Sequence, residues 1–360
     1  MAYGLPSVNI SFTQKGATAI NRGNRGIVAL ILKDTENHNI QPCTVYDSTD
    51  IPSNLEADNK TLILNALKGY TNAPSKLELY VVDTTNDIDK ALEYFDGVQF
   101  DYLAYPQAEE DDKTKVETFI KKLRDTDGIK CKGVLANKAS NHEGIINVTQ
   151  NNIVVGDKTY STGEFTARVA GLLAGTDLRI SCTYADMPEV TSIPYEKRES
   201  VATKIGKGEF VLFKEAGSIK VARGVNSLTS TTSSSEAKGE SFKKIKIIDI
   251  MDLMSNDIRK TARESYLGKY ANSYDNKCML ISAIDGYMDN LINDGLIEAN
   301  SVKVDIDLDS QTAYLKTLNV DVNSLTEKEI REYNTQDKVF IKITCKIVDA
   351  VEDINIAVTV

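Results

Sequence analysis

Histidine is scarce in this chain, which narrows the chemistry available to it. The 360 residues include two histidines, His38 and His142, and each stands among asparagines in a predicted loop. We expect both to be surface residues without a catalytic or metal-binding role. The five cysteines are odd in number and widely spaced, which favours small buried thiols in a reducing compartment over a disulfide framework or a metal site.

Long apolar runs are also missing. No run approaches the roughly 20 residues that span a bilayer, and the start, MAYGLPSVNISF, has no basic region followed by an apolar block. Neither membrane insertion nor a secretory signal is therefore expected. The net charge of −10 argues against a general nucleic-acid partner. The 41% hydrophobic and 26% charged residues are ordinary for a globular protein of two or three domains.

The patterns of ion and nucleotide sites are incomplete. Asp305, Asp307 and Asp309 resemble the start of a calcium loop, but the required glycine and glutamate are replaced. We expect these carboxylates to face water from a strand. The glycines around Lys207 lack the spacing of a phosphate loop. No nucleophile with a partnering base can be assigned from spacing, so we expect no enzyme, no cofactor and no metal.

Both ends of the chain have the pattern of a β-strand with one apolar face. The alternating apolar residues are Val8, Ile10 and Phe12 at the start, and Ile354, Ile356, Val358 and Val360 at the end. A lone strand leaves its backbone groups and its apolar face unsatisfied, so each end must join a sheet. If a neighbouring subunit supplies that sheet, the protein polymerises by strand addition.

Short polar or glycine-containing stretches connect these strands to the rest of the chain and are the expected hinges of two arms. The hinge residues are Gly16, Gly23, Gly26, Asp349 and Asp353. Glycine frees the backbone, which favours a hinge at 21–26 over the alternative that Arg22 and Arg25 hold a phosphate.

Between the arms, strands and helices alternate. We expect strands at 27–32, 77–82, 98–105 and 129–136, with helices at 60–68, 87–95 and 111–124. This order predicts an α/β, or mixed α+β, fold with a central parallel or mixed sheet and flanking helices. Ser161 and Glu164 have the spacing of a capping box that opens a helix at 165–173. A hairpin is expected at 210–222.

A loop rich in serine and threonine at 227–235 separates this region from a second one. There we expect helices at 243–266 and 276–294 and strands at 302–308, 313–322 and 341–347. The predicted divisions are an N-terminal arm (1–22), an N-terminal α/β part of the body (23–90), a central α/β domain (91–240), a C-terminal domain (241–348) and a C-terminal arm (349–360).

Several segments together resemble contractile tail sheath proteins of myophages and of phage-tail-like bacteriocins, especially the short sheaths of Gram-positive hosts. The segments are MAYGLPSVNISF with GIVALIL, STGEFTARVAGLLAGTDLRISCTY, KVARGVNSLTS, KKIKIIDIMDLMSNDIR and the closing strand. ARGVNSL before the serine and threonine loop is the most specific of them. The set extends over nearly the whole chain.

The resemblance implies a structural subunit of a contractile tail sheath. Its six-membered rings would stack helically around an inner tube, be linked by strand exchange of both arms, and contract to drive the tube through a cell envelope. It further implies tube, baseplate and tail terminator proteins as partners, and synthesis in the cytoplasm of a bacterial host. The alternatives to a sheath subunit are another strand-exchanging, self-assembling shell protein and an α/β enzyme.

In that family the C-terminal domain faces the tube, which suggests a role for basic residues around the helix at 243–266. These are Lys243, Lys244, Lys246, Arg259, Lys260 and Arg263. Some of them would meet an acidic tube surface. The alternative is a solvated helix face on which Asp249, Asp252 and Asp257 balance the positive charge.

Overall fold

The computed structural model describes residues 19–20, 22–23, 25–35, 40–82, 88–231 and 238–359. These residues form two compact units, and each is described by itself. The larger unit contains Arg22–Asp257 and Ile347–Val360, and the smaller unit contains Ile258–Lys346. The expected ranges 23–90 and 91–240 both contribute strands to one sheet of the larger unit.

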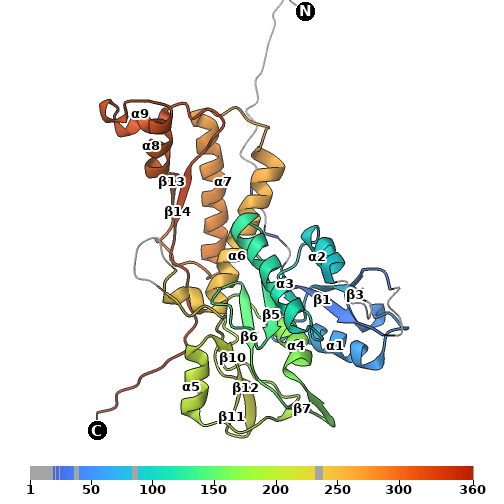
Figure 1. Ribbon diagram of the computed structural model, residues 1–360. Helices are drawn as coiled ribbons and strands as arrows, with labels where there is room; N and C mark the ends of the chain where they lie inside the picture. The colour runs from blue at the N-terminus through green and yellow to red at the C-terminus, as the bar shows by residue number, and fades with distance from the viewer. Residues whose placement is uncertain are drawn as a thin grey trace, which may run out of the picture. The chain divides into compact units, whose positions relative to one another are not determined.

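That sheet has seven strands in the order β10-β6-β5-β4-β1-β3-β2 (Figure 1). Neighbouring strands are parallel except at β2, which pairs antiparallel with β3. The strands are β1 (Ile27–Lys33), β2 (Cys43–Val45), β3 (Lys76–Val82), β4 (Tyr102–Ala104), β5 (Lys132–Ala136), β6 (Ile145–Val148) and β10 (Glu209–Phe210). The fold is therefore a mixed α+β architecture around a central, mainly parallel sheet, as the alternation of elements predicted.

Strand β1 shows why the run IVALIL is continuous rather than alternating. Val28, Leu30 and Leu32 belong to one apolar cluster, which also contains residues of α1 (Ala57–Leu67) and α4 (Thr162–Ala174). Ile27, Ala29 and Ile31 belong to the other, with residues of α2 (Ile88–Asp96) and α3 (Glu110–Lys121). Because helices cover both faces of the sheet, successive side chains of β1 are all buried.

Helix α4 confirms the predicted capping box. The Ser161 side chain accepts a hydrogen bond from the Glu164 backbone N–H, and the Glu164 carboxylate accepts one from the Ser161 backbone N–H. Gly171 lets α4 approach α1 closely, because a Cβ there would lie 1.9 Å from the backbone oxygen of Ala66.

The larger unit also contains a three-stranded sheet, a hairpin and two further helices. They are β7 (Ile153–Val155), β8 (Lys158–Tyr160) and β9 (Val190–Ser192); β11 (Leu212–Glu215) and β12 (Ser218–Val221); and α5 (Arg198–Gly206) and the start of α6 (Ile245–Thr261). The predicted hairpin is confirmed, and its turn residues Ala216 and Gly217 have φ of 48° and 91°. Short 3-10 turns lie at Ser48–Asp50 and Glu240–Lys243, and a π-helical turn follows α3 (Lys122–Thr126). A second π-helical turn, which follows α6 (Ala262–Tyr266), belongs to the smaller unit.

The smaller unit is built on α7 (Tyr274–Asn293) and a two-stranded antiparallel sheet of β13 (Lys303–Ile306) and β14 (Ile341–Thr344). Between these strands lie α8 (Leu308–Thr317), a 3-10 turn (Val322–Ser324) and α9 (Glu327–Glu332). Among the described residues, no helix has the length and apolarity needed to cross a bilayer.

The expected strand at 313–322 is wrong, because the second half of α8 lies there. Gln311 and Leu315 are one helical turn apart and both are fully buried, so the burial follows the helical period rather than the period of two. The expectation that three aspartates face water from a strand holds only in part, because Asp305 lies half-buried on β13, whereas Asp307 and Asp309 belong to the cap and first turn of α8. Asp307 caps α8 by accepting from the backbone N–H of Ser310, and Asp305 pairs with Arg331.

Candidate assembly site: the C-terminal tail and its anchor

The last residues of the described chain are exposed. Ile354, Ile356 and Val358 are 73%, 81% and 78% exposed, and no residue of 348–359 lies in a strand. The alternating pattern at the C-terminus therefore has no sheet within the described part of this chain. Val8, Ile10, Phe12, Gly16 and Val360, which were also predicted for the arms, lie outside the described residues.

The tail before Ile354 is held to the larger unit by a set of polar side chains that we call the tail socket. The socket consists of Ser181, Thr183, Arg223, Lys244 and Lys246. Its contacts begin at Val348, whose backbone oxygen accepts a hydrogen bond of 2.9 Å from Lys246 Nζ. Lys244 pairs with Asp349.

Glu352 is at the centre of the tail socket. Its Oε1 accepts hydrogen bonds from Thr183 Oγ1 at 2.6 Å and from Ser181 Oγ at 2.9 Å. Lys244 Nζ and Arg223 Nε each lie 3.6 Å from its Oε2. Arg223 also donates to Asp353 at 2.6 Å, and this bond is the main cause of its raised pKa.

Backbone contacts between distant segments shape the socket. Gly224 N–H donates to Thr183 Oγ1 at 2.9 Å, and Thr183 N–H donates to Ser181 Oγ at 3.1 Å. A Cβ at Gly224 would lie 2.7 Å from Cys182 Sγ, so a larger residue there would displace the side chains of the facing loop. Gly224 O accepts from the first residue of α6, Ile245 N, at 3.0 Å. The three segments therefore meet where the tail docks.

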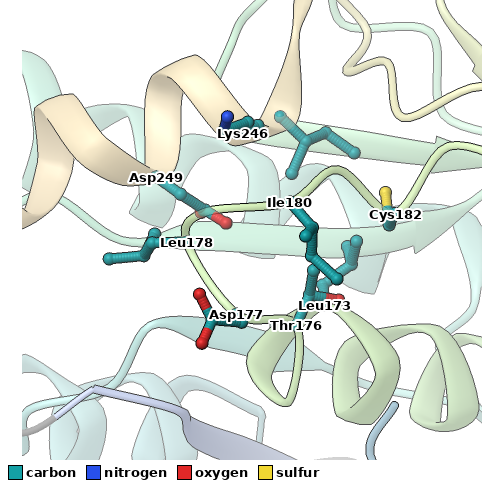
Figure 2. Close-up of a pocket in the computed structure, with 9 residues that line it drawn as sticks. Leu173, Thr176, Asp177, Leu178, Ile180, Cys182, Lys246 and Asp249 are labelled. Atoms are coloured by element: carbon teal, nitrogen blue, oxygen red, sulfur yellow. The ribbon is translucent and has the colours of Figure 1, made fainter. Parts of the chain in front are cut away.

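Figure 2 shows the neighbouring cavity, where Leu178 and Ile180 of the loop after α4 face Lys246 and Asp249 of α6. Its volume of about 10 Å³ has room for at most one water molecule. This cavity is therefore not a ligand site. Burial lowers the pKa of Lys246, whose ammonium group reaches the tail.

The aspartates of α6 do not balance its basic residues on a solvated face, so that part of the sequence interpretation is wrong. Asp252 is buried and accepts two bonds from Arg124, at 2.8 and 2.9 Å, and one from Lys132 at 2.5 Å. Asp249 is buried and pairs with Arg25 at 2.5 Å, and it accepts from Tyr102 OH at 2.5 Å.

These contacts form a buried charge network between the sheet and α6. Burial is the largest single influence on the pKa of Asp252 and raises it, but the charges and hydrogen bonds of Lys132 and Arg124 together outweigh burial, so the net shift of the pKa is downward. The network also fixes the root of the N-terminal arm. Gly23 N–H donates to Asp257 at 2.9 Å, and Gly26, with φ of 84°, donates to Asp101 at 2.7 Å.

The six predicted tube-facing residues divide between the two units. Lys243 pairs with Glu240, while Lys244 and Lys246 hold the tail. In the smaller unit Arg259 is half-buried, and Lys260 and Arg263 are exposed. None of these placements tests a contact with a tube.

We expected His142 to be a surface residue, and this expectation is wrong, because only 7% of it is exposed. The backbone N–H of Gly144 donates to its Nδ1 at 3.0 Å, which places the ring hydrogen on Nε2, 3.1 Å from Asp125 Oδ2. The Nε2 atom therefore has no lone pair for a metal, although Asp125, His142 and Glu143 lie close together. Glu143 pairs instead with Lys238. His38 lies outside the described residues.

Comparison with known proteins agrees with this architecture along the whole chain. Residues 82–227 match the model of the phage tail sheath protein central domain, and residues 237–360 match that of the phage tail sheath C-terminal domain. The tail sheath protein of Clostridium phage phiCD119 is 41% identical over 99% of both chains. A protein of the phage-like element PBSX of Bacillus subtilis is 34% identical over 59% of this chain and 46% of its own length.

Solved structures show the same fold. The sheath tail protein of Desulfitobacterium hafniense superposes with a TM-score of 0.70 at 21% identity, covering 84% of this chain and 94% of that one. The contracted sheath of the extracellular contractile injection system PVC superposes with a TM-score of 0.67 at 13% identity, covering 100% and 98%.

The fold and the matched domains define a structural protein of contractile tails. The chain belongs to the phage tail sheath family, which forms the sheaths of contractile phage tails and related tail-like systems.

Sequence reasoning found the exposed tail but not the tail socket. Ser181, Thr183, Arg223 and Glu352 show no periodicity or spacing that relates them. The sequence indicated the socket only indirectly, because ARGVNSL and the segment ending in SCTY, which supply socket residues, were among the segments that carried the family resemblance.

Proposed function

We propose that this chain assembles into six-membered rings that stack helically around an inner tube, linked by exchange of both arms between subunits. Contraction of this lattice would drive the tube through a cell envelope. The role is mechanical rather than enzymatic. The expected partners are other copies of the chain, the tube protein and the baseplate and terminator proteins, and synthesis would take place in the cytoplasm of the bacterial host.

One observation supports this proposal most directly: an exposed tail with strand-like alternation leaves the larger unit without joining a sheet in residues 348–359. An exposed apolar strand is an aggregation hazard unless a partner covers it. Strand addition to another copy would satisfy its backbone groups and bury Ile354, Ile356 and Val358.

The sheet of β13 and β14 is a suitable acceptor. Among the described residues it has two strands, so each strand has an open edge. Two strands alone are marginally stable, and a third and fourth strand would complete the sheet. Along β14, half-buried Ile341 and Ile343 alternate with exposed Lys342 and Thr344, so an added strand would find one apolar face to continue.

We also propose that Lys260 and Arg263, which are exposed on the π-helical turn and the end of α6, belong to the surface that meets the tube. Lys244 and Lys246 are weaker candidates, because the tail already engages their ammonium groups.

Deleting Asn355–Val360 tests the proposal. The truncated chain should keep the circular dichroism spectrum and thermal unfolding of the full chain, because the deleted side chains that the structure describes are exposed. It should fail to form the hollow tubes of fixed width that electron microscopy should show for the full chain. Tubes of normal length from the truncated chain would refute strand exchange by this arm.

A further inference from the structure

The tail contains one side chain whose burial contrasts with that of its neighbours. Val351 is 83% exposed and Ile354 is 73% exposed, whereas the side chain of Glu352, between them, is 6% exposed. Burial of a carboxylate is unfavourable unless hydrogen bonds and opposite charges compensate for it. A glutamate buried in an otherwise exposed segment therefore indicates a specific binding site for that side chain.

The tail socket has the chemistry that a carboxylate requires. Two hydroxyl donors, of Ser181 and Thr183, reach one oxygen, and two cations lie 3.6 Å from the other. Hydrogen bonds to an ionised acceptor are about twice as strong as neutral ones. The flanking pairs Lys244–Asp349 and Arg223–Asp353 hold the chain on both sides of Glu352.

We propose that the tail socket is the fixed root of the exchanged arm, and that Glu352 is the positioning residue that holds it there. The inference rests on the proposed function, because it concerns how the same arm reaches its neighbour. The free part of the arm then begins after Asp353, at Ile354. The segment Asp349–Asp353, which the sequence suggested as a flexible linker, is instead part of the anchor.

Anchoring at Glu352 shortens the free tether. Without the anchor the mobile chain would extend from 347 to 360, which is 14 residues, and with it from 354 to 360, which is seven. For a flexible chain the mean span falls from about 21 Å to about 15 Å. Because effective concentration falls as about the −3/2 power of tether length, anchoring raises the concentration of the arm at its target about threefold.

The test is a variant that loses all three acidic anchors, D349A/E352A/D353A. The critical concentration for tube growth, measured by light scattering and pelleting of the full-length chain, should rise about threefold at low salt. The ratio of variant to wild type should fall towards one as salt is raised, because screening weakens the ion pairs of the wild-type anchor. E352Q should give an intermediate value, since it keeps an acceptor oxygen but loses the charge.

A matched control removes three exposed acidic residues elsewhere in the larger unit, E93A/D111A/D157A. It changes the net charge equally and should assemble at the wild-type concentration. V351A changes the residue next to Glu352 without touching the socket and should also behave as wild type.

Failure of this inference is distinguishable from failure of the proposed function. If the Asn355–Val360 deletion still forms normal tubes, arm exchange itself is refuted. If the deletion blocks assembly but the triple variant grows at the concentration of its charge control, only the anchoring role is refuted. If thermal unfolding shows that the triple variant is not folded, E352Q replaces it as the test of the anchoring role. A wild-type critical concentration for E352Q would then refute the inference.

Discussion

Replacing Asp252 with asparagine should be among the most destabilising single-atom changes in the larger unit. The substitution keeps the shape of the side chain but removes the charge that faces Arg124 and Lys132. Both cationic side chains are 3% exposed, so water cannot replace the lost partner. Removing one member of a buried ion pair costs about 3–5 kcal/mol of unfolding free energy, because the other charge stays buried without compensation. Lys132 keeps its pair with Asp249 at 3.0 Å, so the uncompensated charge would be mainly that of Arg124.

For a unit of this size, 1 kcal/mol corresponds to about 2–4 °C, so we expect D252N to lower the melting temperature by about 6–20 °C. Urea unfolding at pH 7, followed by circular dichroism, measures the free-energy change directly. The pKa of Asp252 is lowered in the folded state, so its contribution is fully present above its unfolded pKa of about 3.9 and is lost as the pH falls through the folded value. The difference between wild type and D252N should therefore be complete at pH 7 and shrink in acid.

The matched control is D157N, an identical change at an exposed aspartate in the same unit, which should alter the unfolding free energy by less than about 0.5 kcal/mol. A loss of less than about 1 kcal/mol for D252N at pH 7 would refute the argument, because it would mean that the two cations are solvated or paired equally well without Asp252.

Two further predictions concern other sites. G171A should destabilise the larger unit by about 1–3 kcal/mol, because the added Cβ would lie 1.9 Å from the Ala66 backbone oxygen, whereas G206A, with no atom within 4 Å, should be neutral or slightly stabilising. Burial lowers the pKa of His142, so the unfolded state binds more protons below its own pKa of about 6.5, and stability should fall as the pH drops from 7 to 5. Urea midpoints at both pH values should show a smaller drop for H142Q than for wild type and H38Q; an unchanged drop in H142Q would contradict the role of the buried ring.

The elements that the sequence predicted correctly depend on signals contained within one segment. The buried run of β1 and the capping box of α4 are local patterns, readable because the side-chain period or the spacing of two polar residues specifies the structure. The C-terminal tail is a similar case, because the alternation of its apolar and polar residues is a pattern within one segment. Its exposure depends in addition on the path of the chain.

Two predictions failed for different physical reasons. The sequence around His142 is polar, but its ring contacts Asp125 and its backbone N–H and oxygen bond to Ser227, 85 residues later. The expectation for a polar loop residue could not include these partners. The strand expected at 313–322 failed for a local reason. A short apolar pattern fits both periods, and the choice was made by the cap at Asp307 and the burial of Leu315.

The acidic residues of the tail show most clearly why composition alone did not identify the site. Asp349, Glu352 and Asp353 interrupt an alternating pattern, and such an interruption is equally compatible with a solvated linker and with a set of ligands for cations. What distinguishes the two is the position of Arg223 and Lys244, which lie more than a hundred residues earlier in the sequence. The same residues are half-buried beside the tail, and each pairs there with a carboxylate of the tail. If the arm is exchanged as proposed, the residues that hold its root, Arg223 and Lys244 among them, would be distinct from the apolar residues Ile354, Ile356 and Val358 that would bind the neighbour.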